Sequence, residues 1–253
     1  MARPADPHAR DALIAAARAE FVRKGIRGAR IEDITAACGL SKGAFYLHYS
    51  SKEALFGEVV GEFTSGMDGL IAQRLKDAER FFAEHGQLES RDVAERSERY
   101  ERLSALNAEG DLRTLELMWA YRDVMHVLMR GSQGTEFESL VWSLVDREVA
   151  RVANDFQWLQ GTGVCRPDVP PQVIGSLIVG TYLLLAQQMS QMAEKPDLSV
   201  WASSIHRLIR EGSQPSAVLA LVLPEPAPKK TSPRRSTQTR APSRTRSTPR
   251  SGP

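Results

Sequence analysis

The segment between positions 30 and 52, R-I-E-D-I-T-A-A-C-G-L-S-K-G-A-F-Y-L-H-Y-S-S-K, most constrains how this 253-residue chain folds. Its apolar residues recur at helical spacing, which predicts two short helices, about Ile31 to Cys38 and Ser41 to Leu47. Gly39 between them permits the left-handed backbone of a tight turn. Another helix is expected after Ser50-Ser51-Lys52-Glu53, whose S-x-x-E spacing is that of a capping box. We therefore predict a helix-turn-helix unit over residues 30–49.

A cation lies at or beside the start of each of these three helices, namely Arg30, Lys42 and Lys52. The helix dipole makes that end positive and favours Asp or Glu there. Cations at these positions suit a surface on which an external anion docks, because free N–H groups and a positive side chain together bind phosphate. The pattern indicates contact with a nucleic-acid backbone.

Helical periodicity also dominates the rest of the chain, and no strand alternation is evident. A first helix is expected from Pro7 to Lys24, with Gly25 as its stop signal. Beyond residue 63 we expect a larger helical domain, broken at segments that contain glycine or proline, Gly110 among them. Its expected helices are about Met67 to Glu84, Asp92 to Asn107, Leu112 to Met129, Thr135 to Leu159, Pro171 to Ala193 and Ser199 to Glu211. The predicted fold class is all-α.

Charge is distributed unevenly along the chain. Residues 1–63 carry a net charge of +1, residues 64–224 carry −6 and residues 225–253 carry +7. From residue 224 onward there is almost no apolar content, so this basic tail is expected to be disordered. We predict a DNA-binding domain over residues 1–63, a helical domain over 64–223 and the tail over 224–253.

Several classes of protein are disfavoured. The two cysteines, Cys38 and Cys165, give no disulfide framework or CxxC spacing and indicate a reducing compartment. The five histidines form no metal-binding pair, and no motif for a nucleophile, P-loop or dinucleotide is present. We expect neither enzyme activity nor a cofactor or metal. The apolar run near Ile174 to Ala186 is expected to be too short for a bilayer, and the N-terminus lacks a signal peptide, which together indicate a cytoplasmic protein.

The second helix of a helix-turn-helix unit enters the DNA major groove, while flanking helix ends contact phosphates. Lys42 can reach a guanine edge or a phosphate, and Leu47 can contact a thymine methyl. Gly43 and Ala44 keep the leading face of the helix low. The candidate DNA contacts are Arg30, Ser41, Lys42, Gly43, Ala44, Tyr46, Leu47, His48 and Lys52.

This segment resembles the signature of the tetracycline-repressor (TetR) family of bacterial regulators, approximately T-x-x-x-I-A-x-x-A-G-V-S-x-G-x-x-Y-x-H-F-x-x-K-E-x-L. The residues that match in register are Ile34, Gly39, Ser41, Gly43, Tyr46, His48, Lys52, Glu53 and Leu55. The departures are Arg30 for the usual Thr, Thr35 and Cys38 for Ala, Leu40 for Val, and Tyr49 for Phe. Arg30 matters most, because it removes the side-chain cap of its helix. The resemblance is specific over residues 9–63 and only architectural beyond them.

The resemblance implies a homodimeric repressor that reads a near-palindromic operator, with two recognition helices ~34 Å apart. It also implies that residues 64–223 bind ligand and dimerise. A small apolar or amphipathic effector, whose identity the sequence does not reveal, would enter the helical core and shift the population toward a form that releases DNA.

Two sets of residues in this larger domain are candidates for those roles, and ordinary core packing is the alternative for both. An adaptable, polarisable lining with a few polar groups is typical of a ligand pocket. The pocket candidates are Met118, Trp119, Tyr121, Met125, His126, Met129, Trp142, Phe156 and Tyr182. The candidates for the dimer interface lie on the last two helices and are Gly175, Leu177, Gly180, Leu184, Trp201, Ile205 and Leu208.

Two further functions stay open. A related DNA-binding regulator could act without sensing a small molecule. Alternatively, the chain could be an architectural DNA-binding protein whose basic tail adds salt-sensitive, sequence-independent affinity.

Overall fold

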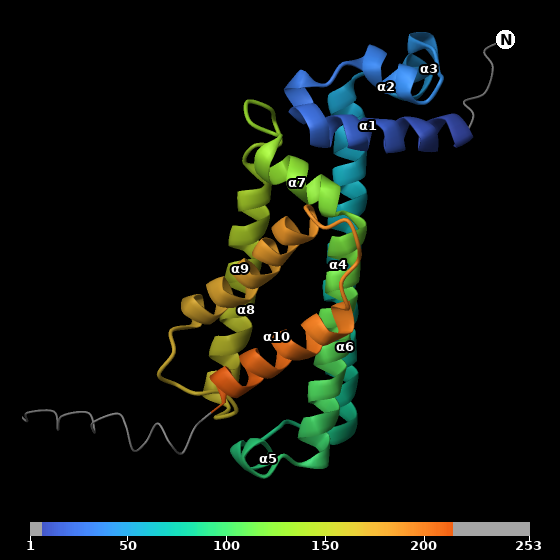
Figure 1. The fold of residues 1–253 in the computed structure, drawn as a ribbon. Helices are drawn as coiled ribbons and strands as arrows, with labels where there is room; N and C mark the ends of the chain where they lie inside the picture. The colour runs from blue at the N-terminus through green and yellow to red at the C-terminus, as the bar shows by residue number, and fades with distance from the viewer. Residues whose placement is uncertain (1–6, 215–253) are drawn as a thin grey trace, which may run out of the picture. The chain divides into compact units, whose positions relative to one another are not determined.

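The computed structural model describes residues 7–214, and over that range the chain is all-helical, as predicted (Figure 1). The predicted basic tail lies outside the described residues. The helices are α1 (Pro7–Gly28), α2 (Ile31–Ala37), α3 (Lys42–His48), α4 (Lys52–His85), α5 (Ser90–Glu95), α6 (Glu98–Ala120), α7 (Arg122–Arg130), α8 (Leu140–Gly161), α9 (Pro171–Met189) and α10 (Leu198–Ser213).

The first three helices and the start of α4 share one apolar core. Phe21, Phe45 and Phe56 are at most 1% exposed, and the rings of Phe21 and Phe56 meet edge to face with centroids 5.4 Å apart. The helix predicted from Pro7 continues to Gly28, but its backbone kinks at Gly25, where φ is +67°. The glycine therefore interrupts the regular helix where the sequence placed its end.

The fourth helix is longer than expected. The separate helix predicted from Met67 is the continuation of α4, so the predicted boundary after Phe63 falls inside a continuous helix. Burial of the stripe that contains Leu55, Val59 and Phe63 outweighs the roughly 1 kcal/mol that each glycine in the helix costs. The predicted Ser50–Glu53 capping box is also wrong: Ser51 is the N-cap, and its Oγ accepts a hydrogen bond from the Ala54 N–H at 3.0 Å.

The break predicted at Gly110 is wrong, because α6 runs through it without interruption. A Cβ at Gly110 would lie 3.1 Å from Nε of Arg74 on α4, so this glycine permits close packing of α6 on α4. The breaks fall instead at Arg96, which is left-handed with φ +50°, and at Tyr121. The helix predicted from Thr135 begins at Leu140.

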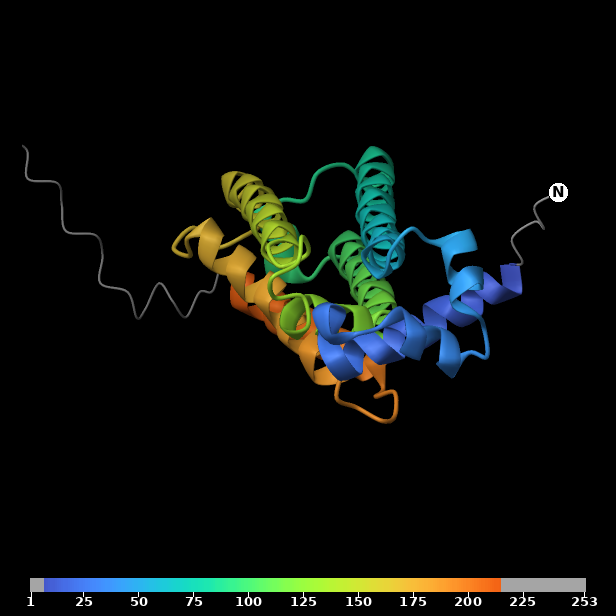
Figure 2. The ribbon, with the colours of Figure 1, turned by 90° about the horizontal axis from the view of Figure 1, so that it is seen from above.

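Each of the last three helices packs against α6, α7 or both. Helix α8 packs along α9, and α10 crosses α6, which lies beside α4 (Figures 1 and 2). A Cβ at Gly175 would lie 2.6 Å from the carbonyl oxygen of Val149, so Gly175 permits close contact between α9 and α8 within one chain.

Helix α9 also corrects an expectation about membranes. Among residues 7–214 it is the one helix that is long and apolar enough to cross a membrane, by length and composition, and 22% of its apolar window is buried. The expectation that this run is too short fails because the helix spans 19 residues, from Pro171 to Met189. A single helix of this kind is weak evidence for a membrane span.

Candidate nucleic-acid interface

Helix α3 is held by a cap at its start and by one buried ring. The Oγ of Ser41 accepts a hydrogen bond from the Ala44 N–H at 3.1 Å, which satisfies one of the free donors of the first turn. Phe45 is fully buried and contacts the rings of Tyr46 and Tyr49. With Phe45 turned into the core, the residues beside it on α3 face outward.

The outward face of α3 carries large side chains. Tyr46 is 51% exposed and Leu47 is 62% exposed, and Ser41, Lys42 and Gly43 at the start of the helix are exposed as well. Ala44 and His48 are partly exposed. The predicted contacts on α3 therefore lie together on a helix that presents its N-terminal residues and two bulky side chains to solvent.

Lys42 has a partner that the sequence did not indicate. Its Nζ lies 2.5 Å from Oε1 of Glu32 on α2, and both side chains are more than half exposed. The ammonium of Lys42 lowers the pKa of Glu32, and the Glu32 carboxylate raises the pKa of Lys42. Because an exposed pair of this kind is weak, Lys42 can leave Glu32 for a stronger anion at little cost.

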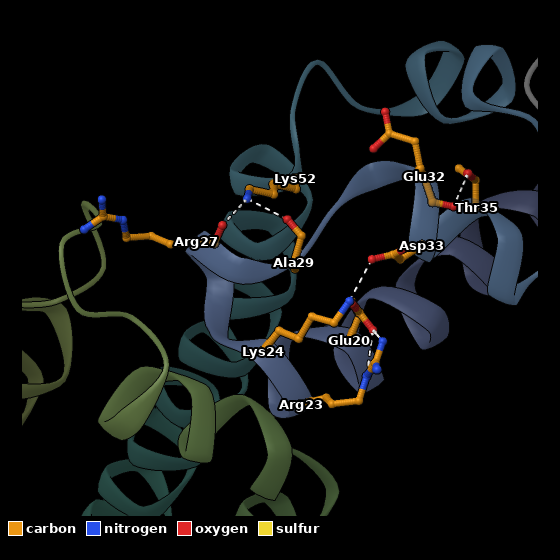
Figure 3. Close-up of polar contacts among 9 residues, drawn as sticks. All are labelled: Glu20, Arg23, Lys24, Arg27, Ala29, Glu32, Asp33, Thr35 and Lys52. Carbon is orange, nitrogen blue, oxygen red and sulfur yellow. Dashed lines mark hydrogen bonds and ion pairs between the residues drawn. The ribbon is translucent and has the colours of Figure 1, made fainter.

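Lys52 is bound inside the protein. Its Nζ donates hydrogen bonds to the carbonyl oxygens of Arg27, at 3.1 Å, and Ala29, at 2.8 Å, and its side chain is only 19% exposed (Figure 3). The ammonium thus ties the start of α4 to the end of α1. Its predicted contact with a phosphate stays a prediction.

Arg30 stands at the N-cap of α2 in extended backbone, is exposed and makes no capping hydrogen bond. The acidic residues that complement the helix dipole are Glu32 and Asp33 in the first turn. Asp33 in turn accepts a hydrogen bond from Lys24 Nζ at 2.7 Å, which joins α2 to α1 (Figure 3). The absence of a side-chain cap at Arg30 can be recognised from the sequence, whereas the hydrogen bond between Lys24 and Asp33 is evident only from the structure.

Helix α1 is also joined to α7. Arg18 donates from Nε to one carboxylate oxygen of Asp123 at 2.6 Å and from a terminal nitrogen to the other at 2.5 Å. The pKa of Arg18 is raised chiefly by its hydrogen bond to Asp123. At the end of α1, the Ile26 N–H donates to the Gly131 carbonyl at 2.9 Å. A displacement of α7 would therefore act directly on the helix that supports α2 and α3.

The predicted pocket residues are divided among the main core, a smaller cluster and the surface. Six of them belong to or pack against the main core: Met118, Trp119, Tyr121, Met125, Met129 and Tyr182. Phe156 lies in a separate small cluster, and Trp142 is 59% exposed on α8. His126 is half-buried, and its Nδ1 lies 3.3 Å from Oγ of Ser190. An open groove of about 710 Å³ lies elsewhere, between α1, α4 and α7.

The predicted interface residues divide into two groups. Leu177, Leu184 and Leu208 are each at least 55% exposed, as are Val173 and Val200 on the same two helices. Gly175 and Ile205 are buried within the chain, while Gly180 and Trp201 are half-buried. The exposed leucines leave apolar area on α9 and α10 without a partner in the described chain.

A buried polar network joins α4, α6 and α10. Asp111 accepts hydrogen bonds from Arg74 at 2.9 Å, and its other oxygen lies 3.2 Å from Nδ1 of His206, whose Nε2 lies 2.9 Å from Oγ of Ser104. Ser104 Oγ also accepts from Arg210 at 3.1 Å and is buried. Buried and bonded to both His206 and Arg210, the Ser104 hydroxyl suits a structural role rather than that of a nucleophile.

Tyr182 lies beside this network. Burial, and then the carboxylate of Asp111, raise the pKa of the Tyr182 hydroxyl. Within residues 7–214, no group of three or more His, Cys, Asp or Glu residues is arranged to hold a metal ion.

Sequence similarity to known proteins is found over the N-terminal part of the chain. Residues 13–59 match the family model for bacterial regulatory proteins of the tetR family. The HTH-type transcriptional repressor DhaR of Mycobacterium sp. (strain GP1) is 45% identical over 58 residues, which are 23% of this chain and 29% of that protein. The chain thus matches less than a third of the length of this relative.

Two solved structures share the fold over most of the chain. The ketosteroid transcriptional regulator KstR2 of Mycobacterium tuberculosis superposes with a TM-score of 0.59 at 17% identity, covering 82% of this chain and 95% of that one. The fatty acid degradation regulator FadR from Bacillus halodurans gives a TM-score of 0.56 at 14% identity, covering 83% and 98%. At these identities the likeness concerns the fold alone.

Proposed function

The chain belongs, through its N-terminal domain, to the tetR family of bacterial regulatory proteins, and from that premise we propose that it is a DNA-binding transcriptional repressor. The observation that carries the proposal is the outer face of α3. Phe45 anchors this helix while Tyr46 and Leu47 stand exposed on it. In the docking geometry of helix-turn-helix proteins, such a face lies in the major groove.

In the proposed complex, Leu47 contacts a thymine methyl and Lys42 exchanges Glu32 for a guanine edge or a phosphate. Tyr46, His48 and Arg30 reach phosphate oxygens, and Ser41, Gly43 and Ala44 let the helix backbone approach the groove. Lys52 contributes by holding α4 against the end of α1, which fixes the angle at which α3 is presented.

The test is duplex binding by fluorescence anisotropy, with a site selected from random DNA. We expect Leu47→Ala to weaken binding to the selected site roughly five-fold or more, while binding to random DNA changes little. Leu75→Ala is the matched control, because Leu75 is 51% exposed on α4, away from α3. Equal affinity of Leu47→Ala and the wild type for the selected site would contradict the proposal.

We further propose that the repressor is a homodimer formed through α9 and α10, acting in the bacterial cytoplasm on a near-palindromic operator. The exposed Leu177, Leu184 and Leu208 support this, since unpartnered apolar area of this kind marks an interaction surface. Half-buried Gly180 and Trp201 would lie at its edge. A second copy pairing there would also cover the apolar face of α9.

The finer proposal is release of DNA by a small apolar or amphipathic effector in the core. Its support is the contact of α7 with α1 through Arg18 and Asp123. A ligand that moved the core residues of α7, Met125 and Met129, would displace α1 as well. A regulator without small-molecule sensing is the second candidate, favoured by the burial of Met118 and Met125 in the main core. Saturable loss of operator binding in a metabolite screen separates the two.

A further inference from the structure

A cavity of about 320 Å³ opens at the seam between α1 and α7. The seam is close, because a Cβ on Gly25 would lie 3.0 Å from the carbonyl oxygen of Gly131. Four cationic side chains, those of Arg23, Lys24, Arg27 and Arg130, line the cavity, and none of its described lining residues is acidic. The cavity is therefore a concave, positively charged site on the joint between the N-terminal helices and the rest of the chain.

Two of these four cations are already neutralised. Arg23 lies 2.5 Å from Oε2 of Glu20, and Lys24 lies 2.7 Å from Oε1 of Glu20 and 2.7 Å from Oδ2 of Asp33. Figure 3 shows both side chains turned toward Glu20. Their charges are satisfied within the protein.

Arg27 and Arg130 are different. The guanidinium groups of both make no hydrogen bond or ion pair with any other residue in the described range 7–214. Figure 3 shows Arg27 extended away from the Glu20 cluster, and it lies against Gly134 in the loop after α7. Arg130 is exposed in the last turn of α7. Each side of the seam thus contributes one unpaired arginine to the same cavity.

Two guanidinium groups on facing elements suit an anion with several oxygens, because each planar fork can donate two parallel hydrogen bonds to a carboxylate or phosphate. His126 also lines the cavity, where its ring is held by the contact of Nδ1 with Oγ of Ser190. A volume of about 320 Å³ is at the lower end for ligand pockets. We propose that this cavity binds a small polyvalent anion, a phosphate ester or a polycarboxylate, through Arg27 and Arg130.

An anion held by both arginines would bridge α1 and α7 beside the backbone hydrogen bond from Ile26 to Gly131. It would favour the arrangement of α1 seen in this structure over any in which the seam opens. If the chain is the repressor proposed above, the anion and the operator then affect each other's affinity by the same factor. The binding site itself does not depend on that function.

The test is isothermal titration calorimetry on the full chain without DNA, with pyrophosphate and with citrate, at an ionic strength held constant with NaCl. We expect one anion per chain, and the anion that binds more tightly identifies the source. Arg27→Ala and Arg130→Ala should each weaken binding about tenfold or more, as the loss of a bidentate charged contact implies. The affinity of Arg130→Lys should lie between those of the wild type and Arg130→Ala, because lysine keeps the charge and loses the planar guanidinium fork.

Arg102→Ala is the matched control, an exposed arginine on α6 paired only with Glu98. The proposal is overturned if neither anion gives saturable binding up to about 10 mM, or if both alanine variants bind as the wild type does. It is also overturned if these variants instead lower the salt dependence of duplex binding while no anion binds, because the arginines would then be DNA ligands. Since the titration contains no DNA, failure of the proposed repressor function leaves it interpretable.

Discussion

Replacing Lys52 by Met separates two roles for this side chain. The substitution keeps the apolar stem and removes the ammonium that donates to the carbonyls of Arg27 and Ala29. A hydrogen bond from a charged donor contributes about 1.5–3 kcal/mol. Because the Lys52 side chain is 19% exposed and so partly hydrated, about 1 kcal/mol for each bond is reasonable. We expect a loss of about 2 kcal/mol, which for a domain of this size lowers the Tm by about 4–8 °C.

The assay combines thermal unfolding with duplex binding across a salt series. If Lys52 acts by anchoring α4 to α1, Lys52→Met lowers the Tm and weakens DNA binding without changing the slope of log affinity against log salt. Lys42→Ala is the control, because its exposed pair with Glu32 leaves the Tm unchanged when it is lost. If Lys52→Met unfolds as the wild type does and the salt slope falls by about one, Lys52 is a phosphate contact and not an anchor.

Four other changes test separate parts of the account. Gly175→Ala should destabilise the chain by about 1–3 kcal/mol in chemical denaturation, because its Cβ meets the Val149 carbonyl. Gly180→Ala is the control, because a Cβ there has nothing within 4 Å. Equal destabilisation by both variants would contradict the α8–α9 contact. Leu184→Glu with Leu208→Glu should give monomers in sedimentation, while Leu75→Glu should not. Hydrogen bonds from Arg99, the Glu89 N–H and Ser97 hold the pKa of Asp92 well below its usual range, so Asp92 stabilises the fold fully above about pH 4 and loses that effect as pH falls further. Asp92→Asn should therefore lower the Tm at pH 7, and the difference in Tm between the variant and the wild type should become smaller below about pH 4. A Tm difference that does not change with pH would contradict this role of Asp92. Truncation after Leu223 should reduce the slope of log affinity against log salt for non-specific DNA binding. An unchanged slope would mean that the basic tail does not contribute to DNA binding.

The N-terminal helices could be predicted from the sequence because their determinants are local. Ser41 caps α3, Gly39 takes φ +69° in the turn, and Gly25 kinks the end of α1. Arg30 could be recognised as a missing cap for the same reason. In each case the residue and the structure it determines lie within four positions of one another.

Contacts with distant parts of the chain could not be predicted from the sequence. Gly110 resembles a helix stop, yet it is a contact surface for Arg74, which lies 36 positions earlier. Gly175 was predicted to lie in a dimer interface, and its close approach to Val149 on α8 could not be foreseen. Lys52 was predicted to contact phosphate, and its hydrogen bonds to the carbonyls of Arg27 and Ala29 could not be foreseen, because they join segments more than 20 positions apart.

The sequence also could not predict that the guanidinium groups of Arg27 and Arg130 have no partner in the described range. Glu20 lies three positions before Arg23 and four before Lys24, whereas Arg27 and Arg130 have no carboxylate at that spacing. Local spacing alone, however, does not exclude a partner from a distant part of the chain. Only the fold shows which carboxylates, Glu20 and Asp33, are already engaged and by which cations.

The most direct test of the central claim is the selection of binding sites by the full chain from random duplexes, followed by footprinting of the selected sequence. We predict an inverted repeat whose half-sites are centred about one helical turn apart, ~34 Å, and which is bound by two chains. Leu47→Ala should weaken that binding. Uniform protection without an enriched motif, at an affinity equal to that for random DNA, would contradict it.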